Sequence, residues 1–113
     1  MMTYKLDNKN GVIHLKASGV LIKEDPISYF NAIDQDENFK AKAEERIYFK
    51  NLKDIKLSYL DVQEIVAAFK KYKHAKKITK GIFIVDSNFS YGMARMIVTI
   101  FEPLFNKFEI ERK

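Results

Sequence analysis

The sequence predicts an α/β fold in which strands and helices alternate after an opening hairpin. The stretch 82–85, Ile-Phe-Ile-Val, is an unbroken apolar run, which is typical of a strand covered on both faces. Polar residues at 86–90 follow it and can cap a helix, so the strand leads directly into a helical segment. Across the chain the patterns give the order β-β-α-β-α-β-α-β, with a mixed sheet that is parallel in its later part.

The chain begins with two short alternating segments, 2–8 and 11–17. Asn10-Gly11 lies between them and is a preferred pair for a two-residue type I′ turn, in which both positions need a positive φ. We therefore expect an antiparallel hairpin closed by such a turn.

Three helices are expected from apolar spacing and capping residues. A short helix begins near Asp25-Pro26. Ser58, with Asp61 three residues later, resembles a capping box for a helix over 59–75. The last helix is expected over 90–106, with Pro103 kinking or shortening it.

Two further strands complete the expected sheet. Residues 46–50 form the third strand, and 51–57 read as a polar connection. Phe108 and Ile110 end the chain on an edge strand, where pairing with a second copy would form a homodimer.

Composition limits the classes of protein that this chain belongs to. Its 113 residues are expected to form a single domain, 1–113. It contains no cysteine, which excludes disulfides and thiolate metal sites. Its apolar runs are shorter than the roughly 20 residues of a membrane span. We expect a soluble, cytoplasmic protein, whose net charge of +5 suits anionic partners without requiring them.

One segment resembles a known family, and it reads Tyr91-Gly92-Met93-Ala94-Arg95-Met96. It is similar to a segment of the SpoIIAA-like (STAS-like) family of small bacterial proteins, and the order of elements extends the likeness over nearly the whole chain. The resemblance implies a β-α superhelical core like that of anti-sigma-factor antagonists, and more loosely like the CRAL-TRIO lipid-binding domain. It brings a fold more than an activity, because most members of this branch are uncharacterised.

Ser58 is a candidate phosphorylation site, because phosphorylatable STAS regulators carry an Asp-Ser-Ser-Gly-type segment in the matching region. Here the region reads Lys-Leu-Ser-Tyr-Leu-Asp, without the preceding Asp and without the Gly. A helix N-terminus would stabilise a phosphate on Ser58. The alternative is an ordinary N-cap contributing about 1 kcal/mol.

The start of the last helix gives a candidate face for a partner or ligand. Tyr91 and Arg95 are four residues apart, so they share a helix side and can bind an anionic ligand or a partner carboxylate. The alternative is a solvated Arg95 that stacks on Tyr91. Ser87 and Asn88, with Asp86, follow a parallel strand at the end where open α/β sheets bind ligands. They form either an anion pocket or a simple capping turn.

Lysines form a basic patch at the end of the second helix, at Lys70, Lys73 and Lys77. Such a face can bind nucleic acid or an anionic membrane surface. Tyr72 belongs to the apolar stripe of the same helix, so no aromatic platform is interleaved among these lysines and base recognition is not expected here. A solvated helix end also explains the lysines.

The sequence shows no catalytic or metal-ligating constellation. His14 and His74 lack ligand spacing, and nucleophile elbows and paired catalytic carboxylates are absent. We therefore expect a non-catalytic binding or regulatory module that acts through protein partners, without a cofactor. The alternative is a small-ligand or lipid-binding domain with an apolar pocket near the last helix, lined by Met93, Phe101 and Phe105.

Overall fold

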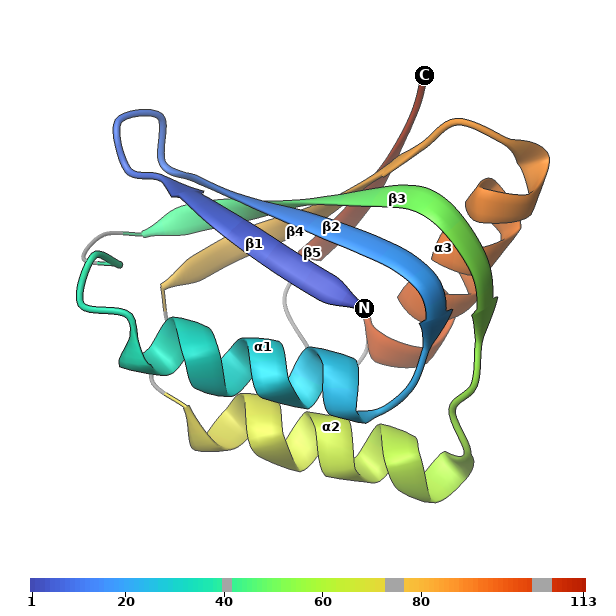
Figure 1. Ribbon diagram of the computed structural model, residues 1–113, viewed down its shortest axis with the longest axis horizontal. Coiled ribbons are helices and arrows are strands. Elements are labelled where there is room, and N and C mark those ends of the chain that lie inside the picture. Colours follow the sequence, from blue (N-terminus) through green and yellow to red (C-terminus); the bar gives the residue numbers. More distant parts are fainter. Residues whose placement is uncertain (40–41, 73–76, 103–106) are drawn as a thin grey trace.

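The computed structural model describes residues 1–39, 42–72, 77–102 and 107–113 (Figure 1). The order of elements in it is the predicted β-β-α-β-α-β-α-β. The elements are β1 (Met2–Asp7), β2 (Val12–Leu21), α1 (Glu24–Gln35), β3 (Ala43–Ile55), α2 (Tyr59–Lys71), β4 (Ile78–Val85), α3 (Asn88–Phe101) and β5 (Lys107–Arg112).

The five strands form one mixed sheet in the order β1-β2-β3-β4-β5. The β1–β2 pair is antiparallel, and the other neighbouring pairs are parallel. In β2 to β5 each strand lies beside the one that precedes it in the sequence. Right-handed crossovers that all advance in the same direction place their helices on one face of the sheet. Phe30 of α1, Ile65 of α2 and Phe101 of α3 accordingly share one core cluster. Figure 1 shows α1 and α2 beneath the sheet, and its upper face without a helix over it.

The core lies between the sheet and this helical layer. Alternation along the strands sends one set of side chains into it, and the most deeply buried include Ile13, Leu15 and Val85. The prediction that 82–85 is a buried strand is confirmed. On the open face, however, Ile82 and Ile84 are each only 8% exposed. Longer side chains on the flanking strands β3 and β5 surround them there, in place of a second helical layer.

The hairpin is present, but the predicted two-residue turn is wrong. Asp7 pairs with Val12, so four residues, 8–11, form the loop. Only Gly11 takes a positive φ there, at 64°. The Asp7 carboxylate accepts hydrogen bonds from the backbone N of Asn10 at 3.2 Å and from its Nδ2 at 2.8 Å. This local bond holds Asn10 in a wider turn than the type I′ turn that it favours.

β3 is much longer than the predicted strand 46–50, and the polar connection at 51–57 is wrong in its first part. Asn51 takes a positive φ of 53°, and the strand then resumes beside the end of β2. Leu52 pairs with Gly19 and is buried. The apolar residues at 20–22 therefore extend β2 and the connection that follows it.

The helices begin close to the predicted positions. Lys23 occupies the N-cap position of α1 without a side-chain capping bond, while the Asp25 carboxylate accepts a hydrogen bond from the backbone N of Ile22 at 2.9 Å. α3 begins at Asn88, two residues earlier than predicted. α2 ends at Lys71 within its predicted range, and 73–76 lie outside the described residues. Pro103 and the rest of the predicted last helix lie outside them too.

Candidate functional site

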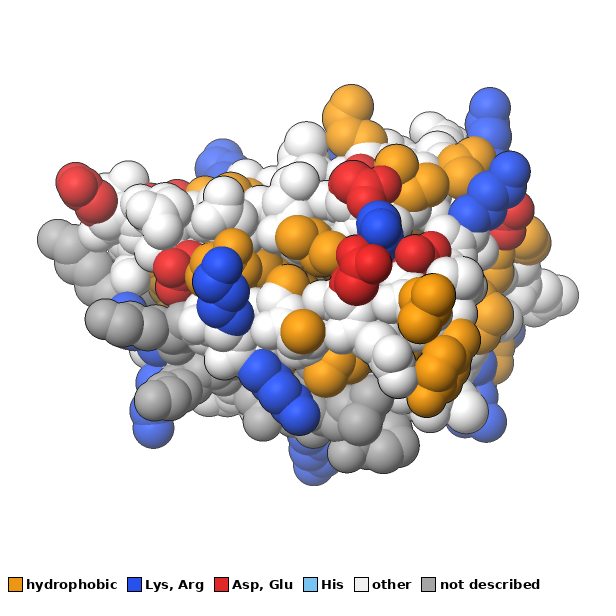
Figure 2. Space-filling model, turned by 90° about the horizontal axis from the view of Figure 1, so that it is seen from below, with side chains coloured by type: hydrophobic (Ala, Val, Ile, Leu, Met, Phe, Trp, Pro, Cys, Tyr) orange, Lys and Arg blue, Asp and Glu red, His pale blue; other side chains and the backbone are white. Residues whose placement is uncertain are grey.

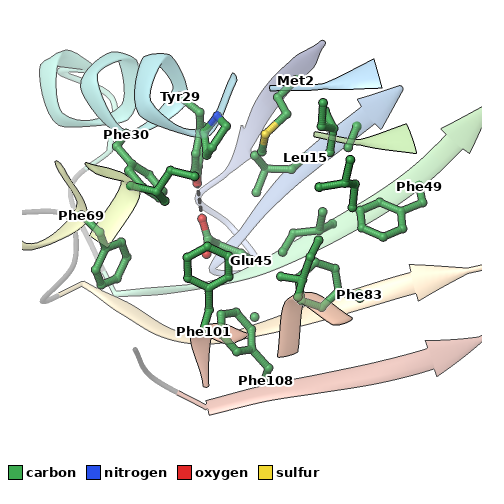
Figure 3. Close-up of a pocket in the computed structure, with 18 of the residues that line it drawn as sticks. Met2, Leu15, Tyr29, Phe30, Glu45, Phe49, Phe69, Phe83, Phe101 and Phe108 are labelled. Carbon is green, nitrogen blue, oxygen red and sulfur yellow. Dashed lines mark hydrogen bonds between the residues drawn. The ribbon is translucent and has the colours of Figure 1, made fainter. Parts of the chain in front are cut away.

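A cavity of about 120 Å³ lies between the sheet and the helices, and Figure 3 shows its walls. All three helices and all five strands contribute lining residues. Among the described residues, the polar side chains in this lining are Tyr29, Glu45 and Lys107. The rest is apolar, both aliphatic and aromatic, and includes Met2, Leu15, Phe30, Phe69, Phe83 and Phe101.

Glu45 is a carboxyl group inside the apolar core. It lies in β3 between Ala43 and Ile47, and the alternation of the strand points all three side chains to the helical side. Glu45 is 8% exposed. A carboxylate in such surroundings loses its hydration, so it needs a hydrogen-bond partner.

Tyr29 supplies that partner from α1. Its hydroxyl donates a hydrogen bond to Oε2 of Glu45, drawn as a dashed line in Figure 3. Burial raises the pKa of Glu45 to about 7, although the Tyr29 hydrogen bond opposes the rise. Burial, together with the nearby Glu45 charge, raises the pKa of Tyr29 well above its usual value. The carboxyl therefore changes its protonation state near neutral pH, while the phenol stays protonated.

Contacts with β1 hold Tyr29 in position. The ring of Tyr4 packs edge-on against that of Tyr29, with centroids 5.6 Å apart. The hydroxyl of Tyr4 donates to Oδ2 of Asp36 at 2.7 Å, just beyond the end of α1. Burial and this bond raise the pKa of Tyr4 to about 12. The first strand and the first helix are thus joined at both positions, which fixes the Tyr29 hydroxyl over Glu45.

The cavity partly matches the pocket expected near the last helix. Phe101 lines it together with Ile97 of the same helix. Met93 packs against the core but is not part of the lining, and Phe105 lies outside the described residues. Glu45 was not predicted as a site residue, because the predicted strand began at residue 46. A glutamate in step with Ala43, Ile47 and Phe49 is the signal that a longer strand would have revealed.

The predicted face at the start of α3 is held together by an arginine from another strand. The guanidinium of Arg112 lies 5.5 Å from the centre of the Tyr91 ring, and its Nη2 donates to Oδ1 of Asn88. Arg95 is exposed on the same helix, and among the described residues no cation–π pair joins it to Tyr91. The expected stacking of Arg95 on Tyr91 is therefore wrong, because Arg112 takes that place.

Ser87 and Asn88 both have hydrogen-bond partners, Ser90 for the first and Arg112 for the second. Ser87 accepts a hydrogen bond from the backbone N of Ser90 at 3.0 Å, and Ser90 Oγ accepts one from Ser87 N at 3.1 Å. This reciprocal pair is the capping turn that was the alternative to an anion pocket. Ser87, Asn88, Tyr91 and Arg95 are all absent from the cavity lining.

An apolar stripe runs along α3 beside this face. Phe89, Met96 and Ile100 are 51%, 40% and 36% exposed, and the half-buried Met93 lies among them at helical spacing. Met93 and Phe101 were predicted to lie on the core side of α3, and both pack against the core. Ala94, which was not among the predicted residues, is also buried there.

Neither a family model nor a curated protein matches this sequence. Among solved structures, the chain resembles an uncharacterised protein of the DUF3478 family with a SpoIIAA-like fold, from Shewanella loihica PV-4. The likeness covers 98% of this chain and 84% of that one, with a TM-score of 0.59 and 15% sequence identity. The chain has a SpoIIAA-like fold. At this identity the likeness concerns the fold alone. It is the fold that the resemblance at residues 91–96 implied.

Ser58 has a clear structural role in this SpoIIAA-like fold. Its side chain accepts a hydrogen bond from Asp61 N at 3.1 Å, and the Asp61 carboxylate accepts one from Ser58 N at 3.0 Å. The predicted capping box is confirmed. Ser58 is also exposed, and its phosphorylation stays a prediction.

The described residues do not bring the lysines of the predicted basic patch together on one surface. Lys70 is exposed on α2 and Lys73 lies outside the described residues. Lys77 turns to Phe39 instead, with its Nζ 3.4 Å from the carbonyl oxygen and 5.3 Å from the ring centroid. Lys70 and Lys77 therefore have different surroundings.

His14 lies among the described residues and has two neighbouring polar side chains. His14 Nδ1 lies 3.2 Å from the hydroxyl of Tyr48, and its Nε2 lies 3.9 Å from Oδ2 of Asp7. His74 is outside the described residues. Within the ranges that the structure describes, no three His, Asp or Glu side chains are grouped to hold a metal ion. None of the helices described here is long and apolar enough to cross a membrane.

Proposed function

We propose that this chain is a binding module whose core cavity holds a small, mainly apolar molecule. The observation that carries the proposal is an apolar cavity of about 120 Å³ with the Tyr29–Glu45 pair in its wall. Two exposed residues, Ile22 and Lys107, also line it, so the cavity extends from the core to the surface. This supports the ligand-binding alternative of the sequence analysis more directly than the partner-binding one.

The size and chemistry of the cavity define the ligand class. An apolar cavity of about 150 Å³ accepts a benzene-sized guest, so this one suits a single ring or a short alkyl chain. A few convergent polar groups in an apolar pocket usually orient the ligand. Glu45 is such a group, and its raised pKa is typical of functional sites. We therefore expect a ligand with an apolar body and one hydroxyl or amino group directed at Glu45.

Binding can be tested with three probes of similar size by ligand-observed NMR. Toluene, benzyl alcohol and benzylamine share a ring and differ in the polar group. We expect the alcohol and the amine to bind more tightly than toluene, and Glu45→Leu to remove that preference. Equal binding of all three to the wild type would contradict the role of Glu45.

A cavity-filling variant tests the cavity itself. Ala17 lines it from β2 and is fully buried, so Ala17→Val places two methyl groups in that space. We expect this variant to remain folded and to lose probe binding, while Ala67→Val on the exposed side of α2 retains it. Unchanged binding by Ala17→Val would place the probes elsewhere and refute the proposal. Native mass spectrometry after gentle purification then identifies any co-purified molecule.

A second candidate function, binding of a protein partner, is favoured by the α3 stripe. Phe89, Met96 and Ile100 form an exposed apolar surface beside Tyr91 and Arg95, and such surfaces are typical of interaction sites. Figure 2 shows further hydrophobic side chains at the surface of the helical layer, and Tyr59 and Leu60 are exposed where α2 begins.

Pull-downs compare Phe89→Ser/Met96→Ser with Tyr91→Ala/Arg95→Ala. Loss of partners only in the first variant would assign binding to the stripe. Loss in the second would assign it to the predicted face. Recovery of the same proteins by both variants and by the wild type would count against partner binding at α3.

We also propose that the module works without catalysis, in the cytoplasm. The support for both statements is the sequence, which lacks cysteine and the spacing of a nucleophile with its base. A regulatory role would join the two functions above, with the ligand in the core changing what α3 binds.

A further inference from the structure

The open face of the sheet carries a second group of side chains that the cavity does not use. Alternation directs Lys5, Lys16 and Lys50 away from the core, on the three adjacent strands β1, β2 and β3. His14 and Tyr48 lie on the same face between them. In Figure 1 no helix lies over this upper side of the sheet.

Strand register arranges the three lysines on a diagonal. Lys5 is opposite His14, Lys16 lies two residues beyond His14 and opposite Tyr48, and Lys50 lies two residues beyond Tyr48. Each step crosses one strand and advances two residues, which corresponds to about 8 Å between Cα atoms. His14 and Tyr48 form a second, parallel diagonal beside the first. The face thus presents a regular line of cations next to a line of aromatic rings.

These residues surround a shallow hollow of about 270 Å³. Its lining includes the three lysines, the two rings and Thr3. The His14 and Tyr48 rings are stacked, with centroids 5.9 Å apart and planes 27° apart. The hollow therefore has an aromatic side and a basic side.

The three lysines carry charge that neighbouring carboxylates do not neutralise. Over the ranges that the structure describes, none of them is within 4.0 Å of a carboxylate oxygen. Two other cations facing this side are paired, Arg46 with Glu44 at 3.6 Å and Lys80 with Glu109 at 2.7 Å. Lys113 adds a further positive charge, with its Nζ 5.8 Å from the centre of the Tyr48 ring.

We propose that this face binds a short single-stranded nucleic acid. The phosphates follow Lys5, Lys16 and Lys50, and an unstacked base packs on the Tyr48–His14 pair. Evenly spaced cations complement a chain of regularly spaced anions better than a single anion. Aromatic rings beside a basic groove are what proteins use to hold single strands without reading their sequence. An anionic membrane presents no planar base to pack on the two rings.

The sequence could not reveal this surface. In the lysine run near residues 70–77 the ring of Tyr72 packs against the core, and base recognition was not expected there. On the open face the lysines and the rings come from three strands, and only the sheet register brings them together.

The test measures fluorescence anisotropy of a fluorescein-labelled oligothymidylate of ten nucleotides. We expect Lys5→Gln/Lys16→Gln/Lys50→Gln to weaken binding about tenfold or more at 50 mM salt. The matched control, Lys56→Gln/Lys70→Gln/Lys71→Gln, removes the same charge from exposed lysines of α2 and its preceding connection. It should bind within about twofold of the wild type. Three phosphate contacts predict a slope of about −2 for the logarithm of affinity against the logarithm of salt concentration. In the Lys5→Gln/Lys16→Gln/Lys50→Gln variant this slope should fall close to zero.

Tyr48→Leu separates nucleic-acid binding from general attraction of anions. Stacking of one base predicts roughly 5- to 150-fold weaker binding of the oligonucleotide by this variant. The wild type should bind inorganic polyphosphate more weakly than the oligonucleotide. Tyr48→Leu should leave polyphosphate binding unchanged. The proposal is overturned if the two triple variants bind alike, or if Tyr48→Leu leaves oligonucleotide binding unchanged. It is also overturned if uridine monophosphate binds as tightly as the oligonucleotide, which would show a site for a single nucleotide.

Discussion

The hydroxyl of Tyr29 donates a hydrogen bond to the buried carboxyl of Glu45, which joins α1 to the middle strand of the sheet. The contact lies in the wall of the core cavity, among aromatic and aliphatic side chains. Because burial keeps the Glu45 pKa near 7, the strength of this contact and the stability of the fold both depend on pH around neutrality.

Glu45→Gln is expected to stabilise the protein at alkaline pH and to have little effect at pH 5. Above pH 4.5, the usual value for a glutamate, the unfolded chain loses the proton while the folded chain retains it until about pH 7. The wild type therefore loses stability as pH rises between these values, and the loss from Glu45 reaches about 3 kcal/mol. The uncharged Gln does not titrate, and its amide oxygen can still accept the Tyr29 hydrogen bond.

Urea denaturation of both proteins at pH 5, 6, 7 and 8 measures this difference. Subtracting the two curves removes the contributions of all other titrating groups. The difference in unfolding free energy should grow with pH and level off above about pH 7. Parallel curves for the two proteins would show that Glu45 titrates normally, and that it is not buried as described.

Tyr29→Phe should destabilise the protein most strongly above pH 7. The variant keeps the ring but leaves the ionised carboxyl without this donor, which costs about 1–3 kcal/mol. The Tyr29 hydrogen bond lowers the Glu45 pKa, so its removal should raise that pKa further. Below pH 4.5, where Glu45 is mostly protonated in both states, the cost should be smaller. Adding Glu45→Gln to Tyr29→Phe tests the coupling, and a cost that does not vary with pH would contradict it.

Local signals were enough to predict much of this fold. The apolar run at 82–85 and the Ser58–Asp61 capping box depend on neighbouring residues only, and both are confirmed. The hairpin was predicted, but its turn was not, because the Asp7 side chain competes for Asn10. The element order came from the same local patterns, and the resemblance at 91–96 added the fold.

The candidate site depended on information that local patterns do not contain. Whether Glu45 faces the core follows from the full length of β3, and the predicted strand was too short to show it. Its partner Tyr29 lies 16 residues earlier, and packing of α1 brings the two together. Arg112 replaces Arg95 at Tyr91 for a similar reason, because β5 ends beside the start of α3. Contacts between distant segments were therefore the part that sequence reasoning missed.

Ser58→Ala and Ser87→Ala are expected to destabilise the protein by different amounts. Ser58 is exposed and its cap should contribute about 1 kcal/mol. Ser87 bonds to Ser90, which is buried, so its loss leaves a buried hydroxyl with one partner fewer and should cost about 1–2 kcal/mol. Asn is an equally good cap, so Ser58→Asn should retain wild-type stability. Thermal unfolding of the three variants measures these effects, and a larger loss at Ser58 than at Ser87 would contradict the argument.

Gly81→Ala should destabilise the sheet because of one neighbour. Gly81 in β4 pairs with Phe108 in β5, and a Cβ at Gly81 would lie 2.8 Å from Cδ1 and Cε1 of that ring. The ring also packs against Phe83, with centroids 5.6 Å apart, so moving it disturbs a second contact. Overpacking of this kind costs about 1–3 kcal/mol.

Phe108→Leu should reverse the sign of the Gly81→Ala effect. The smaller side chain removes the clash, and alanine is then better than glycine inside a strand by roughly 0.5–1 kcal/mol. A double-mutant cycle by urea denaturation measures the coupling between the two positions, which we expect to exceed 1 kcal/mol. Additive effects would mean that the ring of Phe108 does not lie over Gly81, and β5 would then pair with β4 in another register. Because Phe108 also lines the cavity, the same variants report whether β5 forms part of its wall.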